Sequence, residues 1–264
     1  MSTILDKIAA SRMVRVREAK TSRPEALLKE KISSQSGALD VFGRLREFPG
    51  DKRPIIAEVK RKSPSKGDIA PTLNAAETAS AYQRGGAFAI SCLVEPDFFG
   101  GSLEDLASVR GAVDIPVLYK DFVVDPYQFL EARAFGADIV LLIVALLGDR
   151  TEEYHELAVQ AGLTPLVEVH DEAELDIALR AGSRLVGVNN RNLKTFEVDL
   201  NVGASLLSGI GEGRYGVAES GIHSVRDMDF LAENGADAFL IGESLVSSGD
   251  PEGLLRTFVK RGRG

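Results

Sequence analysis

The sequence predicts an α/β fold, a closed (β/α)8 barrel of eight parallel strands alternating with helices, preceded by an N-terminal helical extension. The first observation is a series of eight short, apolar, β-rich runs after residue 53. The second is helical spacing of apolar residues between the runs, as in residues 154–161. The third is a glycine just before several of the runs, where a helix C-terminus is expected. A chain of 264 residues is a common length for one such barrel.

The eight runs are the predicted barrel strands, in the order in which a strand–helix repeat would place them. They are Ile55–Lys60, Ala87–Val94, Pro116–Phe122, Asp138–Ile143, Pro165–His170, Leu185–Asn189, Tyr215–Glu219 and Ala238–Ile241. An open doubly wound sheet is the alternative. A GxGxxG turn after the first run would favour that sheet, and the sequence has no such turn there.

Residues 1–48 differ from the rest of the chain and predict an extension of short helices. Helical spacing of apolar residues predicts one helix over residues 4–20, Pro24 opens a second that ends near residue 32, and residues 39–48 suggest a third piece. The segment is too short and too charged to form its own core. We therefore expect it to pack on the barrel, so that residues 1–264 form a single domain.

Composition and charge exclude several classes of function. The net charge of −8 argues against a general nucleic-acid surface, although a local basic pocket for a small anion fits. The longest apolar run, residues 139–147, is too short to span a bilayer, and no secretory signal follows Met1. The single cysteine, Cys92, lies in an apolar run and is expected to be a buried thiol. The three histidines lie far apart, without metal-ligand spacing. We expect a cytoplasmic protein that uses no metal.

Polar residues gather where the predicted strands end, and such a barrel carries its function at that end. These residues are Glu58, Lys60, Lys62, Ser63, Lys120, Glu168, Asn189, Arg191, Glu219, Ser220, Gly221, Gly242 and Glu243. Period-two alternation places the ionisable members on the same strand face as an apolar neighbour, as for Lys120 and Leu118. Converging lysines and glutamates indicate acid–base chemistry. For each residue alone, a solvated rim position, a surface ion pair or a turn cap stays open.

The last two strand ends resemble the phosphate site of many barrels. Ser220-Gly221 and Gly242-Glu243 are each expected to open a helix, whose backbone N–H groups would hold an anion. Lys62 and Ser63 are placed to contribute from the first strand. Because a carboxylate repels phosphate, the backbone of Glu243 and not its side chain is expected to face the ligand. The expected ligand is a small phosphorylated molecule.

Seven sequence blocks, in order, resemble the signature blocks of one enzyme family. They are IIAEVKRKSPSKGDI, EPDFFGGSLEDL, LYKDFVVDPYQ, LVEVHDEAEL, VGVNNRNLKTFEVDL, VAESGI and FLIGESLV. Together they resemble indole-3-glycerol phosphate synthase, a barrel family with extra N-terminal helices. The resemblance implies ring closure of 1-(2-carboxyphenylamino)-1-deoxyribulose 5-phosphate to indole-3-glycerol phosphate, with loss of CO₂ and water and without a cofactor.

The resemblance also implies roles for single residues. Lys120 would be the general acid, and Glu168 would be the base of the later dehydration. Lys60 would hold the substrate carboxylate and act as a further proton donor. Glu58 would position both lysines. The remaining positions would bind substrate: hydroxyls at Asn189, Arg191, Glu219 and Ser220; phosphate at Lys62, Ser63, Gly221, Gly242 and the Glu243 backbone; and the aromatic ring at Phe99 and Phe122. For the two phenylalanines, plain core packing is the alternative.

Two further expectations concern acidity and competing functions. A lysine that donates a proton near neutral pH should have a lowered pKa, and we expect burial beside Lys60 to lower that of Lys120. A sister phosphosugar isomerase, of the phosphoribosylanthranilate isomerase type, would need a Cys/Asp pair that the first strand lacks. A non-catalytic phosphosugar-binding barrel would be expected to lack Lys120 or Glu168. We expect a monofunctional monomer, with weak self-association as the alternative.

Overall fold

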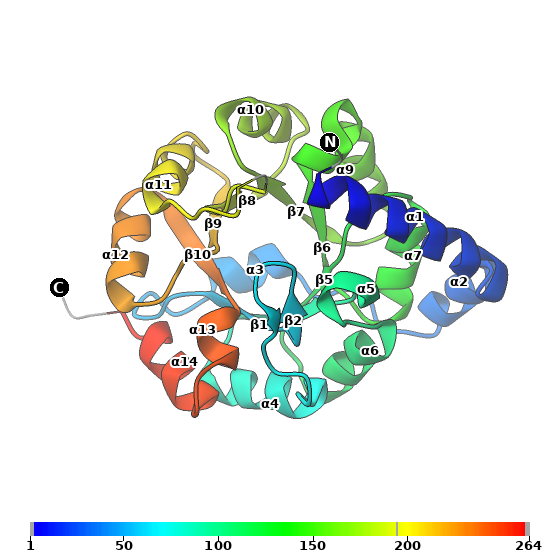
Figure 1. The fold of residues 1–264 in the computed structure, drawn as a ribbon, viewed down its shortest axis with the longest axis horizontal. Helices are drawn as coiled ribbons and strands as arrows, with labels where there is room; N and C mark the ends of the chain where they lie inside the picture. Colours follow the sequence, from blue (N-terminus) through cyan, green and yellow to red (C-terminus); the bar gives the residue numbers. More distant parts are fainter. Residues whose placement is uncertain (1–2, 194, 262–264) are drawn as a thin grey trace.

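The computed structural model describes residues 3–193 and 195–261, and its centre is a closed barrel of eight parallel strands ringed by helices (Figure 1). The barrel strands are β1 (Ile55–Val59), β4 (Ala89–Leu93), β5 (Val117–Lys120), β6 (Ile139–Ile143), β7 (Thr164–Val169), β8 (Leu185–Asn189), β9 (Tyr215–Glu219) and β10 (Ala236–Ile241). The strand β1 pairs with β4 on one side and with β10 on the other, which closes the ring. The predicted (β/α)8 barrel is confirmed, and the open sheet is excluded.

The strand residues alternate between two hydrophobic clusters, one inside the barrel and one between the barrel and the helices. Ile56, Leu118 and Leu166 belong to the inner cluster. Their neighbours Ala57 and Tyr119 belong to the outer cluster. This alternation follows from the pleat of a strand, which turns successive side chains to opposite faces. Residues two positions beyond the inner members therefore point into the barrel as well.

Helices return the chain from the end of each strand to the start of the next. The covering helices are α4 (Ala75–Gly85), α6 (Leu103–Ala112), α7 (Tyr127–Ala134), α9 (Thr151–Gln160), α10 (Glu172–Arg180), α11 (Leu200–Ser208), α12 (Val225–Glu233) and α14 (Pro251–Val259). Short pieces follow the strand ends: β2 (Lys62–Ser63), β3 (Gly67–Asp68), α5 (Pro96–Phe99), α8 (Val144–Leu147), a 3-10 turn (Gly148–Arg150) and α13 (Glu243–Val246). The predicted glycines follow helices with a left-handed φ, as at Gly86 (96°) and Gly235 (103°).

The N-terminal segment forms three helices: α1 (Ile4–Ser22), α2 (Glu25–Ser33) and α3 (Val41–Arg46). Both α1 and α2 pack against α7 on one side of the barrel (Figure 1). Val41 and Leu45 of α3 join the inner cluster. The flanking Phe48 packs edge-on against Phe88, which precedes β4. The helix α3 therefore covers the N-terminal ends of the strands and leaves the opposite ends open.

Two other expectations can be compared with the structure. Cys92 is 1% exposed in the outer cluster, and burial raises the pKa of its thiol. The prediction of a buried structural thiol is confirmed. Within residues 3–193 and 195–261, no helix combines the length and the apolar character needed to cross a bilayer.

Candidate active site

A cavity opens at the C-terminal ends of the strands, and the ionisable residues predicted from the sequence line it. Glu58, Lys60, Lys120, Glu168 and Glu219 all contribute to its wall. The Nζ atom of Lys120 lies 2.8 Å from Oε2 of Glu219 and 3.5 Å from Oε2 of Glu168. The Nζ atom of Lys60 lies 2.9 Å from Oε1 of Glu58. Two lysines and three carboxylates from four strand ends therefore meet in one pocket.

The other predicted residues lie at the same cavity, with one exception. Its wall also includes Ser63, Phe99, Phe122, Asn189, Arg191, Ser220, Gly221, Gly242 and Glu243. Lys62 is absent from this wall, because its Nζ atom donates to the backbone carbonyl of Asp97 at 2.7 Å. In this structure Lys62 thus joins the loop after β1 to α5 and does not face the cavity.

Lys120 has an environment that differs from the sequence expectation. Its side chain is 13% exposed, and burial alone would lower the pKa of its ammonium group. The nearby carboxylates of Glu219, Glu168 and Glu58 outweigh burial and raise this pKa. The predicted lowering of the Lys120 pKa is therefore wrong. The prediction considered Lys60 as the main neighbour, whereas three carboxylates surround the ammonium group.

Glu168 and Glu219 share Lys120 but differ in their acidity. Burial raises the pKa of Glu168, but Lys120 and His170 outweigh burial and hold it below its usual value. For Glu219, burial raises the pKa, Lys120 opposes this, and the charge of Glu168 adds to the increase. Neighbouring carboxylates with separated pKa values are typical of acid–base sites. His170 was not among the predicted site residues, although it follows Glu168 by two positions on the same strand face.

The end of the cavity near β9 and β10 carries unusual backbone. Ser220 has a φ of 65° and Gly221 a φ of 73°, and a non-glycine residue rarely adopts this conformation. Such strain gathers at functional sites. The helix after this turn begins only at Val225, so the expectation that Ser220-Gly221 opens a helix directly is wrong. Gly242 does precede α13 directly.

The side chain of Glu243 turns away from α13 to an ion pair with Lys66, in the loop between β2 and β3. The expectation that the Glu243 backbone, and not its carboxylate, faces an anion stays a prediction. Lys66 was not among the predicted site residues. Its link to Glu243 brings the loop after β1 to the rim formed by the last strand.

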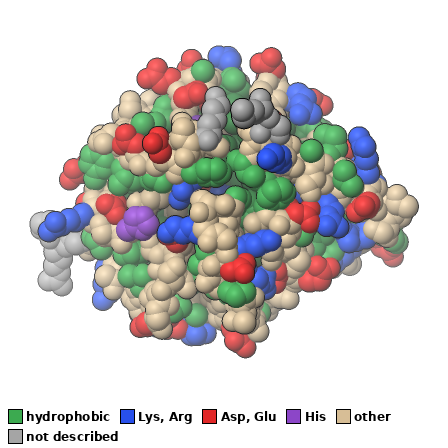
Figure 2. Space-filling model, viewed as in Figure 1, with side chains coloured by type: hydrophobic (Ala, Val, Ile, Leu, Met, Phe, Trp, Pro, Cys, Tyr) green, Lys and Arg blue, Asp and Glu red, His purple; other side chains and the backbone are tan. Residues whose placement is uncertain are grey.

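The opposite side of the cavity is apolar. The rings of Phe99 and Phe122 lie with centroids 5.8 Å apart, and Ile4, Leu5 and Ile8 of α1 complete this wall. The three α1 residues were predicted as the apolar face of a helix but not as part of the site. Figure 2 shows hydrophobic side chains gathered across the middle of this face, next to lysine and arginine side chains.

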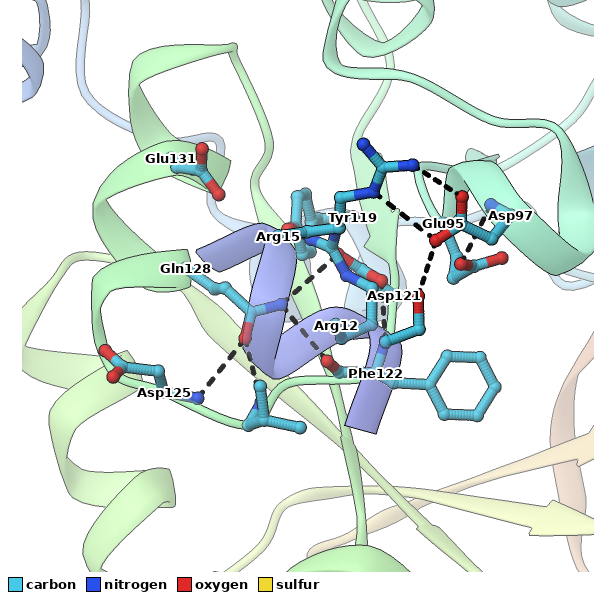
Figure 3. Close-up of polar contacts among 12 residues, drawn as sticks. Arg12, Arg15, Glu95, Asp97, Tyr119, Asp121, Phe122, Asp125, Gln128 and Glu131 are labelled. Carbon is cyan, nitrogen blue, oxygen red and sulfur yellow. Dashed lines mark hydrogen bonds and ion pairs between the residues drawn. The ribbon is translucent and has the colours of Figure 1, made fainter. Parts of the chain in front are cut away.

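A buried polar network links α1 to the residue that follows Lys120 (Figure 3). Arg12 of α1 donates to Oδ2 of Asp121 at 2.6 Å, and their side chains are 8% and 0% exposed. The hydroxyl of Tyr119 donates to the same oxygen at 2.7 Å, and the amide of Gln128 does so at 3.2 Å. Gln128 also accepts from the backbone N–H of Val124 at 2.8 Å. The network therefore anchors the loop that carries Phe122.

A strand glycine makes room for one of the carboxylates and gives a first prediction. A Cβ atom on Gly187 of β8 would lie 2.3 Å from Oε1 of Glu219, a contact that forces the buried carboxylate to move. We expect Gly187→Ala to reduce the free energy of unfolding by about 1–3 kcal/mol, as overpacking does. Urea denaturation measures this loss. Gly37→Ala is the matched control, because no atom of residues 3–193 or 195–261 lies within 4 Å of its added Cβ. Equal stability of both variants would contradict the close contact.

The described residues hold no group of three His, Cys, Asp or Glu side chains arranged to bind a metal ion. The chemistry that the geometry supports is proton transfer and charge stabilisation by Lys120, Lys60 and the three glutamates. The cavity thus has an apolar wall on one side and a turn with left-handed backbone at Ser220 and Gly221 on the other.

A family model described as indole-3-glycerol phosphate synthase matches residues 5–258. The chain belongs to this family. Among curated relatives, the indole-3-glycerol phosphate synthase of Parafrankia sp. is 48% identical over 263 residues, covering 99% of this chain and 96% of the relative. The indole-3-glycerol phosphate synthase of Mycolicibacterium gilvum is 48% identical, covering 99% of this chain and 94% of the relative. The indole-3-glycerol phosphate synthase of Beutenbergia cavernae is 45% identical, covering 98% of this chain and 96% of the relative.

Membership of the indole-3-glycerol phosphate synthase family confirms the resemblance found in the sequence blocks and the enzyme class, a carboxy-lyase, that it implied. A solved structure of thiamine phosphate pyrophosphorylase from Pyrococcus furiosus resembles the fold. Its TM-score is 0.58 at 16% identity, with 78% of this chain and 93% of that chain covered. That similarity supports the barrel alone.

Proposed function

We propose that this chain converts 1-(2-carboxyphenylamino)-1-deoxyribulose 5-phosphate to indole-3-glycerol phosphate by lysine and glutamate acid–base catalysis. The observation that carries the proposal is the position of Lys120, whose ammonium group lies between Glu168 and Glu219 inside the cavity of a family member. We further propose that the chain acts as a cytoplasmic monomer and needs neither a metal nor a cofactor.

The two ends of the cavity suggest how the substrate lies. The carboxyphenyl ring would pack on Phe99, Phe122 and the apolar face of α1. The phosphate would accept hydrogen bonds from the backbone N–H groups at Gly221 and Gly242-Glu243 and from the hydroxyl group of Ser63. Lys66, which pairs with Glu243 at the rim, would add positive charge beside this end in place of Lys62, which donates to the Asp97 carbonyl. The ribulose carbonyl then falls between the two ends, beside Lys120.

Ring closure joins the aromatic carbon that bears the carboxylate to the ribulose carbonyl carbon. Negative charge grows on the carbonyl oxygen, and Lys120 donates a hydrogen bond and then a proton to it. Because carboxylates raise its pKa, Lys120 enters this step fully charged, and it acts chiefly as an electrostatic donor. Lys60, paired with Glu58, would hold the substrate carboxylate until CO₂ leaves with cleavage of its carbon–carbon bond.

Dehydration completes the reaction. The hydroxyl group made from the carbonyl leaves as water, taking one proton from a lysine, and Glu168 removes a proton from the adjacent carbon so that the double bond forms. A base must be ionised to act, and Lys120 and His170 keep the Glu168 pKa low. Asn189, Arg191 and Ser220, at the rim near β8 and β9, would bind the hydroxyl groups of the sugar chain.

The test is the appearance of indole-3-glycerol fluorescence after the carboxyphenylamino substrate is added to the purified protein. We expect product to form at a rate proportional to the protein concentration, in buffer containing a metal chelator. Calorimetry with the same substrate separates binding from turnover. Tight binding of unchanged substrate would refute the synthase proposal and leave a non-catalytic phosphosugar-binding barrel.

A further inference from the structure

His170 lies at the end of β7 with its ring between two carboxylates. Its Nε2 atom is 3.3 Å from Oε1 of Glu168, and its Nδ1 atom is 3.0 Å from Oε2 of Glu174. That Glu174 oxygen also accepts the backbone N–H of His170 at 2.8 Å. The His170 side chain is 12% exposed. The helix α10, which carries Glu174, therefore sets the orientation of the imidazole ring.

The two oxygens of Glu168 face different cations. Oε1 faces His170 at 3.3 Å, and Oε2 faces Lys120 at 3.5 Å. Rotation of the carboxylate would weaken both contacts at once. A catalytic group performs best when neighbouring side chains hold its rotamer, and here His170, at an ion-pair distance without hydrogen-bond geometry, is placed to restrain Glu168.

We propose that His170, oriented by Glu174, is a positioning residue that fixes Glu168 through Oε1 and leaves Oε2 directed at Lys120 and the substrate. The inference rests on the proposed function, because it takes Glu168 as the base of dehydration. It adds two residues, His170 and Glu174, to the groups on which that base depends.

The charge on the imidazole follows from all the groups around it. Burial lowers the pKa of His170, but Glu168 and Glu174 outweigh burial and raise it to about 10. The adjoining cavity adds other charged residues, which are Asp6, Asp171, Arg191, Glu197 and Asp199. At neutral pH His170 is therefore an imidazolium. Loss of its positive charge would raise the pKa of Glu168, so that the base would become protonated at a higher pH.

Kinetics of His170→Gln test the proposal, since glutamine keeps a polar side chain without the charge. We expect kcat at neutral pH to fall about tenfold, with KM within about twofold, and the acidic limb of the kcat profile to move up by about one pH unit. Glu174→Gln should shift the same limb in the same direction. Because both residues act through one carboxylate, the double variant should be no worse than His170→Gln alone. His155→Gln, on α9 and outside the cavity wall, should keep the wild-type profile.

A second measurement does not depend on activity. The chain has three histidines, so the ring signals of His170 can be assigned by their loss in His170→Gln. In nitrogen NMR spectra at about pH 8, both ring nitrogens of His170 should carry protons, whereas an ordinary histidine is neutral there. A neutral ring would overturn the proposal. An unchanged acidic limb in Glu174→Gln, or in a folded His170→Gln, would also overturn it. Absence of product with the wild-type protein would instead refute the proposed function.

Discussion

Replacing Lys120 by alanine is expected to lower kcat by about 10²- to 10⁴-fold, the usual contribution of a positioned proton donor. The ammonium group of Lys120 lies 3.5 Å from Glu168 and 2.8 Å from Glu219, and it lines the cavity in which the carbonyl oxygen would gain charge. Alanine removes both the hydrogen bond to that oxygen and one of the two positive charges that lower the pKa of Glu168. Initial rates of indole-3-glycerol fluorescence measure the loss.

The control for Lys120→Ala is Lys29→Ala. Lys29 lies on α2, and among the described residues its one ion pair is with Glu25 of the same helix, both side chains being largely exposed. We expect this variant to keep the wild-type kcat. A calorimetric titration with substrate and a circular dichroism melt show whether Lys120→Ala still binds and folds. A folded Lys120→Ala with a kcat within a few-fold of wild type would remove Lys120 as the donor.

Replacing Asp121 by asparagine is expected to reduce the free energy of unfolding by about 3–5 kcal/mol, because a buried ion pair is broken on one side only. Arg12 would keep its charge at a site where its side chain is 8% exposed. Burial alone would lower the pKa of the Arg12 guanidinium, but the charge of Asp121 outweighs burial and holds this pKa above its usual value. Denaturation by urea, followed by circular dichroism, measures the change.

A second arginine pair calibrates the Asp121→Asn measurement. Arg256 pairs with Glu252 on α14 at 2.7 Å, with side chains 58% and 28% exposed. Arg256→Met should cost less than about 1 kcal/mol, as exposed pairs do. Adding Arg12→Met to Asp121→Asn should recover part of the lost stability, because the unpaired charge is then gone. If Asp121→Asn lowers the free energy of unfolding no more than Arg256→Met does, then Arg12 is hydrated. The polar network around Asp121 would then not be sealed from solvent.

The barrel strands are the part of this protein that the sequence predicted best, because their side chains alternate between two faces with a fixed period of two residues. Alternation along a strand placed Lys120 with Leu118 and Glu168 with Leu166, and the structure has these leucines inside the barrel. All eight strands were placed from the same pattern: β8 and β9 match the predicted bounds, and the other strands differ by one or two residues at an end. The strands appear as nearly continuous apolar runs because a closed parallel barrel buries both of their faces, and the pleat then assigns alternate residues to the inside.

What periodicity missed are contacts between segments far apart in the chain. Asp121 has the opposite parity to Lys120, so its side chain points toward the helical layer, where Arg12 of α1 meets it from 109 positions away. No local pattern indicates such a partner. Lys62 follows a strand end in a Ser/Pro/Gly-rich loop, whose direction the strand does not determine. The error about the Lys120 pKa has a similar origin, because its sign depends on distances to carboxylates from three other strands.

The pairing of β1 bears on how the protein becomes active during folding. Its hydrogen-bonded neighbours are β4, made shortly after it, and β10, made near the end of the chain, with Ile55 opposite Phe239. Until β10 emerges from the ribosome, one edge of β1 lacks a partner, and contacts of such large sequence separation form slowly. Glu58 and Lys60 stand on this edge, beside the turn at Gly242. The site is therefore complete only when β10 pairs with β1 and the ring closes.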